Sequence, residues 1–204
     1  MSADQLISII SDSLVAISAI VVASVAICGL NTWRRELKGR VLFDIARKII
    51  RLSIELRANF EWARFPLSTS TESSGRQKAI GESTGETLAK DAWYVKYQRL
   101  KPLTTNIQSL QEMDWEIQTL LGDKSQKISN AIKIYRECYA KLKVDIDEYF
   151  EIKVDEAIKQ SQYPQQDYLT ELSHIIYGTS TDDFSKTICS VHDQLAGELK
   201  AFIK

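Results

Sequence analysis

The apolar run from Leu6 to Leu30 constrains this chain more than any other feature of its sequence. The run contains one formally charged residue, Asp12, and the stretch from Ser13 to Leu30 contains none. As an α-helix that stretch would rise about 27 Å, so with the preceding turn it matches a hydrocarbon core about 30 Å thick. The sequence therefore predicts one transmembrane helix within residues 1–31.

A cleaved signal peptide is the main alternative to a retained span. Signal peptides open with positive charge, whereas the residues before Ser13 carry only Asp4 and Asp12. Ser24-Val25-Ala26 resembles a small-residue cleavage site, but the apolar run that precedes it is long for a signal sequence. We therefore expect the segment to stay attached as a membrane anchor.

The distribution of positive charge predicts the orientation of the span. No Lys or Arg precedes it, whereas many follow it, and by the positive-inside rule the N-terminus lies outside and the C-terminal domain in the cytoplasm. In that reducing compartment we expect the three cysteines, Cys28, Cys138 and Cys189, to be thiols.

The rest of the chain has helical periodicity almost throughout, which predicts an all-α fold with a cytosolic bundle of four or five helices. Residues 32–66 form a basic juxtamembrane helix that ends at Pro66, and residues 67–86, rich in small polar side chains, form a mobile loop. Residues 87–204 form the helical bundle and pack against 32–66. Within it, we expect Pro102 to kink or split a helix and Gly122 to end it; the best-patterned helix spans 125–160, Pro164 restarts the chain, and Thr181 or Asp182 caps the last helix.

Motifs for catalysis are not evident. The sequence has neither a glycine-rich phosphate loop nor a nucleophile motif, so we expect no enzyme activity and no cofactor. Cys189 and His192 share one helical face, with His174 and Cys138 as conceivable further zinc ligands, but packing explains so sparse a pattern better and we predict no metal. The acidic residues of 145–156 fit a solvated helix face.

Small residues form a seam along the predicted span. Ala16, Ala19, Ala23 and Ala26 recur at spacings of three and four, which would let identical helices approach closely. Asp12 falls one turn before Ala16, and Ser11 and Ser18 line an adjacent polar strip. Either Asp12 faces a shared lumen, where a ring of carboxylates would favour cations, or it marks the outer interface and the alanines are ordinary.

The basic residues after the span have two interpretations. They are topological anchors that touch anionic lipid head groups, or they form an oligomeric collar that holds an anionic ligand such as an oligonucleotide. The set is Arg34, Arg35, Lys38, Arg40, Arg47, Lys48 and Arg51, which Arg57 and Arg64 would extend. Among the aromatic residues we expect Trp33 at the membrane interface, and Trp62, Trp93, Tyr94 and Trp115 in the core.

One stretch resembles known proteins. Trp33-Arg34-Arg35-Glu36-Leu37-Lys38-Gly39-Arg40, followed by Leu42-Phe43-Asp44-Ile45-Ala46-Arg47 and by Phe65-Pro66-Leu67, resembles a set of bacterial proteins with one N-terminal span. The architecture is similar to that of the small membrane effectors of bacterial anti-phage systems, including the Hailong type. This resemblance implies an oligomeric, ligand-restrained channel in the bacterial inner membrane, and it transfers no ligand-binding residue.

These observations lead to two hypotheses of different class. In the first, the chain is an inner-membrane effector in antiviral defence, a homo-oligomer whose spans open a depolarising ion channel when a cytosolic restraint changes. In the second, the same span tethers a helical scaffold or adaptor that recruits a cytosolic partner. A pore requires its own lining and an oligomer, whereas a tether requires only hydrophobicity.

Overall fold

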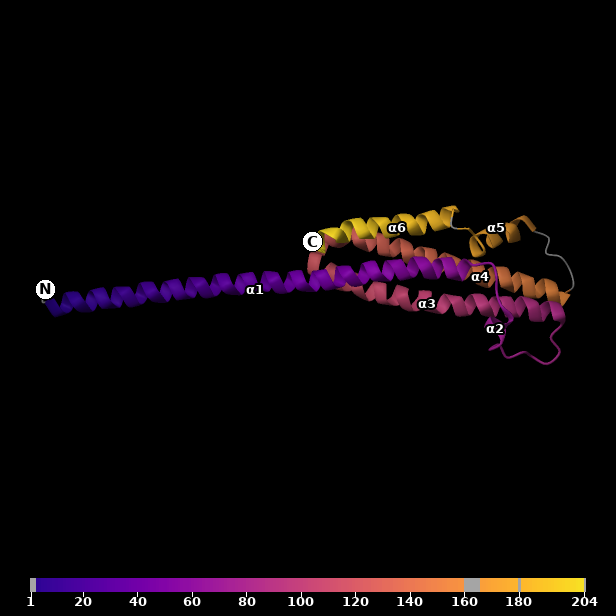
Figure 1. The fold of residues 1–204 in the computed structure, drawn as a ribbon, viewed down its shortest axis with the longest axis horizontal. Helices are drawn as coiled ribbons and strands as arrows, with labels where there is room; N and C mark the ends of the chain where they lie inside the picture. The colour runs from indigo at the N-terminus through magenta and orange to yellow at the C-terminus, as the bar shows by residue number, and fades with distance from the viewer. Residues whose placement is uncertain (1–2, 160–165, 180, 204) are drawn as a thin grey trace. The chain divides into compact units, whose positions relative to one another are not determined.

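The computed structural model describes residues 3–159, 166–179 and 181–203, with side chains from residue 14 onward. Over those residues the chain is helical without a β-strand, so the predicted all-α fold is confirmed (Figure 1). Six α-helices and two short 3₁₀ turns cover the described ranges: α1 (Ala3–Arg64), α2 (Ser70–Ser73), α3 (Thr84–Leu121), η1 (Gly122–Ser125), α4 (Gln126–Lys159), α5 (Gln166–Ile176), α6 (Asp183–Leu199) and η2 (Lys200–Phe202).

The chain divides into two compact units, Met1–Asp44 and Ile45–Lys204. The first unit consists of the N-terminal part of α1, and every described side chain in it up to Val41 is exposed. α1 is continuous through residue 31, where we expected a transmembrane helix to give way to a juxtamembrane helix, and through Gly39. No proline interrupts the chain before Pro66, so the backbone has no reason to leave the helix earlier.

The second unit has one hydrophobic core to which five helices contribute. α1 supplies Ile45, Ile49, Leu56 and Phe60, which follow the predicted apolar stripe at intervals of three and four. α3, α4, α5 and α6 supply the facing side chains, among them Leu103, Ile132, Leu142, Ile176 and Leu195. Figure 1 shows α5 and α6 lying along α4. The predicted four- or five-helix bundle is therefore present.

Helix-ending and helix-capping residues in the sequence correctly predicted the end of α3 and the start of α6. Gly122, at φ 57°, follows the last residue of α3, as its position in the sequence predicted. Asp182 caps α6, where its carboxylate accepts a 2.8 Å hydrogen bond from the Ser185 N–H. The predicted helix over 125–160 corresponds to α4, while the predicted restart at Pro164 lies outside the described residues.

Pro102 does not split its helix, contrary to one of the two expected outcomes. α3 runs unbroken from Thr84 to Leu121 with Pro102 inside it. Leu100 and Leu103, on either side of the proline, are both buried in the core. Burying these two side chains in the core stabilises α3 and compensates for the one backbone hydrogen bond that Pro102 cannot donate.

The segment 67–86 has more structure than the expected mobile loop. It contains α2, and Arg76 donates two hydrogen bonds to Glu82, at 3.0 and 2.7 Å, and a third to Asp91. The side chains of Arg76 and Glu82 are only 9% and 6% exposed. The sequence argument counted apolar area alone, whereas here buried ion pairs order the segment.

Candidate functional site

The apolar surface of the first unit is the first candidate site. Large side chains such as Leu14, Ile20 and Val22 are 60%, 66% and 68% exposed. This helix is long and apolar enough to cross a membrane, and none of that apolar stretch is buried. Nothing within the described chain covers it.

The seam predicted on this helix is only partly described. Ala16, Ala19, Ala23 and Ala26 are exposed, as a helix–helix contact requires. The Ser18 hydroxyl donates to the Leu14 carbonyl at 2.8 Å, a backbone partner that satisfies it without water. The side chains of Asp12 and Ser11 lie outside the described residues.

The predicted basic residues are exposed in both units. Arg34, Arg35, Lys38 and Arg40 lie in the first unit, and Arg47, Lys48 and Arg51 lie in the second. Arg51 pairs with Glu55 at 2.9 Å and Arg57 with Glu61 at 3.4 Å, one helical turn away in each case. Exposed ion pairs of this kind contribute little free energy, so the arginines can exchange these partners for an external anion.

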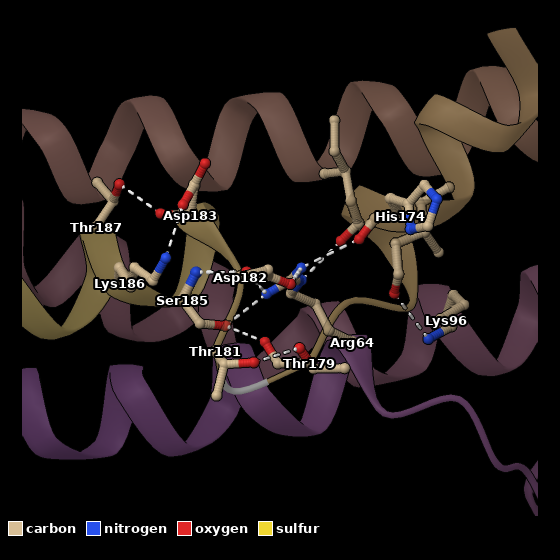
Figure 2. Close-up of polar contacts among 12 residues, drawn as sticks. Arg64, Lys96, His174, Thr179, Thr181, Asp182, Asp183, Ser185, Lys186 and Thr187 are labelled. Carbon is tan, nitrogen blue, oxygen red and sulfur yellow. Dashed lines mark hydrogen bonds and ion pairs between the residues drawn. The ribbon is translucent and has the colours of Figure 1, made fainter. Parts of the chain in front are cut away.

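Arg64 does not belong to this exposed set, so its expected place in an anion-binding collar is wrong. Its side chain is only 3% exposed. It donates to both carboxylate oxygens of Asp182, to the Ser185 hydroxyl at 2.7 Å, and to the carbonyls of His174 and Ile175 (Figure 2). All the N–H donors of the Arg64 guanidinium are engaged within the bundle, so none remains for an external anion.

Gly178 lies close against this arginine. A Cβ atom at residue 178 would lie 1.7 Å from Nη2 of Arg64 and 1.9 Å from Oδ2 of Asp182. Although partial burial opposes the charged form, hydrogen bonds from Arg64 and the Ser185 N–H hold the pKa of Asp182 below its usual value. A side chain at residue 178 would therefore have to displace the paired ends of Arg64 and Asp182.

Lys96 makes a second buried contact with the same helix ends. Its Nζ donates to the carbonyls of Ala63, Phe65 and Ile176 at 2.9, 3.0 and 3.3 Å, and lies 4.3 Å from the centre of the Tyr177 ring. These carbonyls lie at the C-terminal ends of α1 and α5, where backbone carbonyls have no partner within their own helix. Lys96 supplies the missing donor. Burial, with the nearby charges of Arg99 and Arg64, lowers the pKa of Lys96 to about 7.

Arg99 completes this group, which we call the cation cluster: Arg64, Lys96 and Arg99. Arg99 donates to the Phe65 and Leu67 carbonyls at 2.9 and 2.7 Å and makes two hydrogen bonds to Glu72. Its guanidinium lies 4.2 Å from the Trp62 ring centre. The cluster donates hydrogen bonds to carbonyls at the C-terminal ends of α1 and α5, and these contacts tie the two helix ends to α3.

Sequence reasoning missed the cation cluster, although one signal was present. Lys96 and Arg99 stand three residues apart, on a stretch where Val95, Leu100 and Leu103 are also buried. Cations on the apolar side of a helix are expected to be paired when they are buried. Asp145, expected on a solvated face, is likewise only 7% exposed, and burial raises its pKa.

The four conceivable zinc ligands do not form a metal site in the described part of the chain. His192 Nδ1 lies 3.0 Å from the hydroxyl of the buried Ser53, and that hydroxyl donates to the Ile50 carbonyl. Nδ1 of His192 is therefore engaged with Ser53 inside the bundle. Among the residues whose placement is described, His, Cys, Asp and Glu side chains do not gather in threes that could hold a metal ion.

The tryptophans differ from expectation. Trp62 and Trp115, expected in the core, are 48% and 59% exposed, and Trp93 is half-buried against the core. Trp62 instead stacks on Phe65 at 6.0 Å between ring centres and covers Arg99. Trp33 is 59% exposed in the first unit, as an interfacial residue would be.

The described fold and surfaces define an all-α protein with one helix able to span a membrane and a five-helix bundle. Comparisons with protein-family models, curated proteins and solved structures give no match to this chain.

Proposed function

We propose that this chain is a membrane effector that assembles through its N-terminal helix and opens a depolarising pore. The observation that carries the proposal is that every apolar side chain from Leu14 to Leu30 is exposed. A helix in a water-soluble protein buries one face, whereas this one leaves every face uncovered. Lipid and neighbouring copies are the surroundings that suit it.

Assembly is part of the proposal because one helix cannot enclose a channel. The exposed seam of Ala16, Ala19, Ala23 and Ala26 supplies a surface on which identical helices approach closely. A closed ring of such contacts would leave the opposite faces to lipid. Asp12 would then lie near one mouth of the pore, where carboxylates favour cations.

We place the protein in the bacterial inner membrane, with the bundle in the cytoplasm and a role in antiviral defence. The exposed Arg34, Arg35, Lys38 and Arg40 support this orientation because they directly follow the apolar stretch. Arg47, Lys48 and Arg51 remain available to anionic head groups, to a cytosolic regulatory partner or to an anionic oligonucleotide. The defence role rests on the similarity of the architecture to that of bacterial anti-phage membrane effectors.

A membrane-tethered scaffold is the second candidate, and the serines of the span favour it. Ser18 and Ser24 both donate their hydroxyls to backbone carbonyls four residues earlier, at 2.8 Å. Hydroxyls satisfied in this way tolerate lipid and do not require a water-filled lumen.

Replacing residues 1–30 by an unrelated single-span anchor separates the two candidates. Cells that express the intact chain should lose membrane potential, read with a potential-sensitive dye, while cells that express the swapped chain should not. The swapped chain must remain in the membrane fraction after carbonate extraction, which shows that anchoring is intact. Equal depolarisation by both chains, or none by the intact chain once it is assembled and its cytosolic restraint is lifted, would exclude the pore.

A further inference from the structure

A groove of about 710 Å³ opens between α3, α4 and the segment 76–82. Its volume lies within the range of small-molecule sites, about 300 to 1,000 Å³. Trp93, Phe150 and Val154 give it apolar lining, and Asp147, Glu151 and Asp155 bring carboxylates to it from α4. All of these residues belong to the second unit.

The wall formed by segment 76–82 is held in place by buried charge. Arg76 binds both carboxylate oxygens of Glu82 and also Asp91, and its side chain is 9% exposed. The hydrogen bonds from Arg76 and the Ala79 N–H lower the pKa of Glu82 to about 2. Desolvating these groups costs free energy that is recovered only with good geometry, so the wall has one favoured position.

The aromatic lining is also fixed before any ligand enters. The Trp93 ring stacks on Tyr97 with 5.5 Å between ring centres, and its Nε1 donates to Asp147 at 3.3 Å. Two contacts on different sides of the indole hold its orientation. A ring held in this way loses little side-chain entropy on binding.

The charge of the groove is negative once its internal pairs are counted. Arg76 is neutralised by Glu82 and Asp91, and Lys90 lies 2.5 Å from Glu86 and 3.5 Å from Glu82. The Glu151 carboxylate, by contrast, makes neither an ion pair nor a side-chain hydrogen bond with the part of the chain that the structure describes. Among the described residues, the ion-pair partners of Asp147 and Asp155 are Lys143 and Lys159, whose side chains are 46% and 66% exposed.

We propose that this groove binds a small organic cation, an amine with an aromatic or aliphatic body. The apolar lining takes the body of the ligand, and Trp93 offers a ring face for cation–π contact. The ammonium group lies toward Glu151, which is the carboxylate without a partner among the described residues. An organic anion of the same shape would meet Asp147, Glu151 and Asp155 and be repelled. This site does not depend on the proposed pore.

The test is isothermal titration of the full-length protein in a neutral detergent with tryptamine, phenethylamine and spermidine. Indole-3-acetate serves as the matched anion, and detergent without protein corrects for partition into micelles. At least one amine should bind saturably at millimolar or lower concentration, and indole-3-acetate should bind about tenfold more weakly or not at all.

Two variants assign the binding to this groove. E151Q should weaken amine binding about two- to fivefold, since an exposed charge contact contributes modestly, and E151Q/D155N should weaken it further. E137Q is the control because Glu137 is an exposed carboxylate of the same helix, paired with Lys133 and not part of the groove lining. Absence of saturable binding by all three amines, equal binding of indole-3-acetate, or equal effects of E151Q and E137Q would each overturn the proposal.

Discussion

Arg64, the last residue of α1, donates hydrogen bonds to both carboxylate oxygens of Asp182, the residue that caps α6. Asp182 therefore serves two helix ends at once, since its Oδ1 also accepts from the Ser185 N–H. The pair joins residues that lie 118 positions apart in the chain. It is a charged link between the end of α1 and the start of α6.

Replacing Arg64 by methionine should destabilise the bundle by about 1 to 3 kcal/mol, because it leaves the partly buried Asp182 carboxylate without its charged partner and two carbonyls without their side-chain donor. Chemical unfolding of the full chain in detergent, followed by circular dichroism, measures the change. Arg57→Met is the matched control, since Arg57 is 48% exposed and pairs only with Glu61. That variant should change stability by no more than about 0.5 kcal/mol. Equal effects of the two substitutions would contradict the internal role of Arg64.

Two glycine substitutions should have opposite signs. Gly178→Ala places a Cβ on Arg64 and Asp182, at 1.7 and 1.9 Å, so it must displace the pair and lower the unfolding free energy. Gly197→Ala meets nothing within 4 Å and lies inside α6, where alanine should stabilise by about 0.5 to 1 kcal/mol. Thermal unfolding of both variants beside the parent checks the contrast. A Gly178→Ala protein as stable as the parent would show that the turn has another conformation available.

Because the pKa of Lys96 is lowered, we expect the stability of the protein to depend on pH above neutrality. Its pKa is about 7 in the folded protein, against about 10.4 in an unfolded chain, so between these values the unfolded state binds more protons. Stability should therefore rise as pH increases from about 7 toward 9. The measurement stays below pH 10 because burial raises the pKa of Tyr177 to about 12, and such tyrosines reverse the slope at higher pH.

Lys96→Met removes the titrating group and should flatten this slope. The variant leaves the carbonyls of Ala63 and Ile176 without their side-chain donor, while Phe65 keeps Arg99, so its absolute stability should also fall. Unfolding free energies at several pH values separate the two effects, since the first changes the slope and the second the level. A slope that survives in Lys96→Met must arise from another group.

The sequence predicted those parts of the structure that depend on near neighbours. Gly122 and Asp182 end and begin helices through contacts within a few residues, so their effect is legible in the sequence. The cation cluster depends instead on Arg64 meeting residues more than 100 positions away, and periodicity contains no information about such partners. Trp62 was misplaced for a related reason: a large aromatic residue beside a buried stripe reads as core unless its helical face is known.

The groove between α3 and α4 was equally hidden from the sequence. Segment 76–82 reads as a disordered stretch because its small polar residues bury little apolar area. Its order comes from the ion pairs of Arg76 with Glu82 and Asp91, which form only when the segment folds back on α3.

Acid should weaken these ion pairs. Because the pKa of Glu82 is lowered to about 2 in the folded protein, the stability that this contact contributes is lost as pH falls from about 4.5 toward 2.

Assembly through the alanine seam gives the last prediction. Ala19→Ile/Ala23→Ile adds bulk to the face where neighbouring helices would approach, so the mass of the detergent-solubilised particle should fall toward that of a monomer. Val21→Ile/Val25→Ile is the control, because at 3.6 residues per turn these positions lie on the opposite side of the helix. That variant should keep the mass of the parent, since isoleucine suits a lipid-facing position. Light scattering with detergent correction measures all three proteins. A monomeric parent would exclude the pore outright, whereas an oligomer unchanged by the seam substitutions would place its interface elsewhere, on the bundle or on another face of α1.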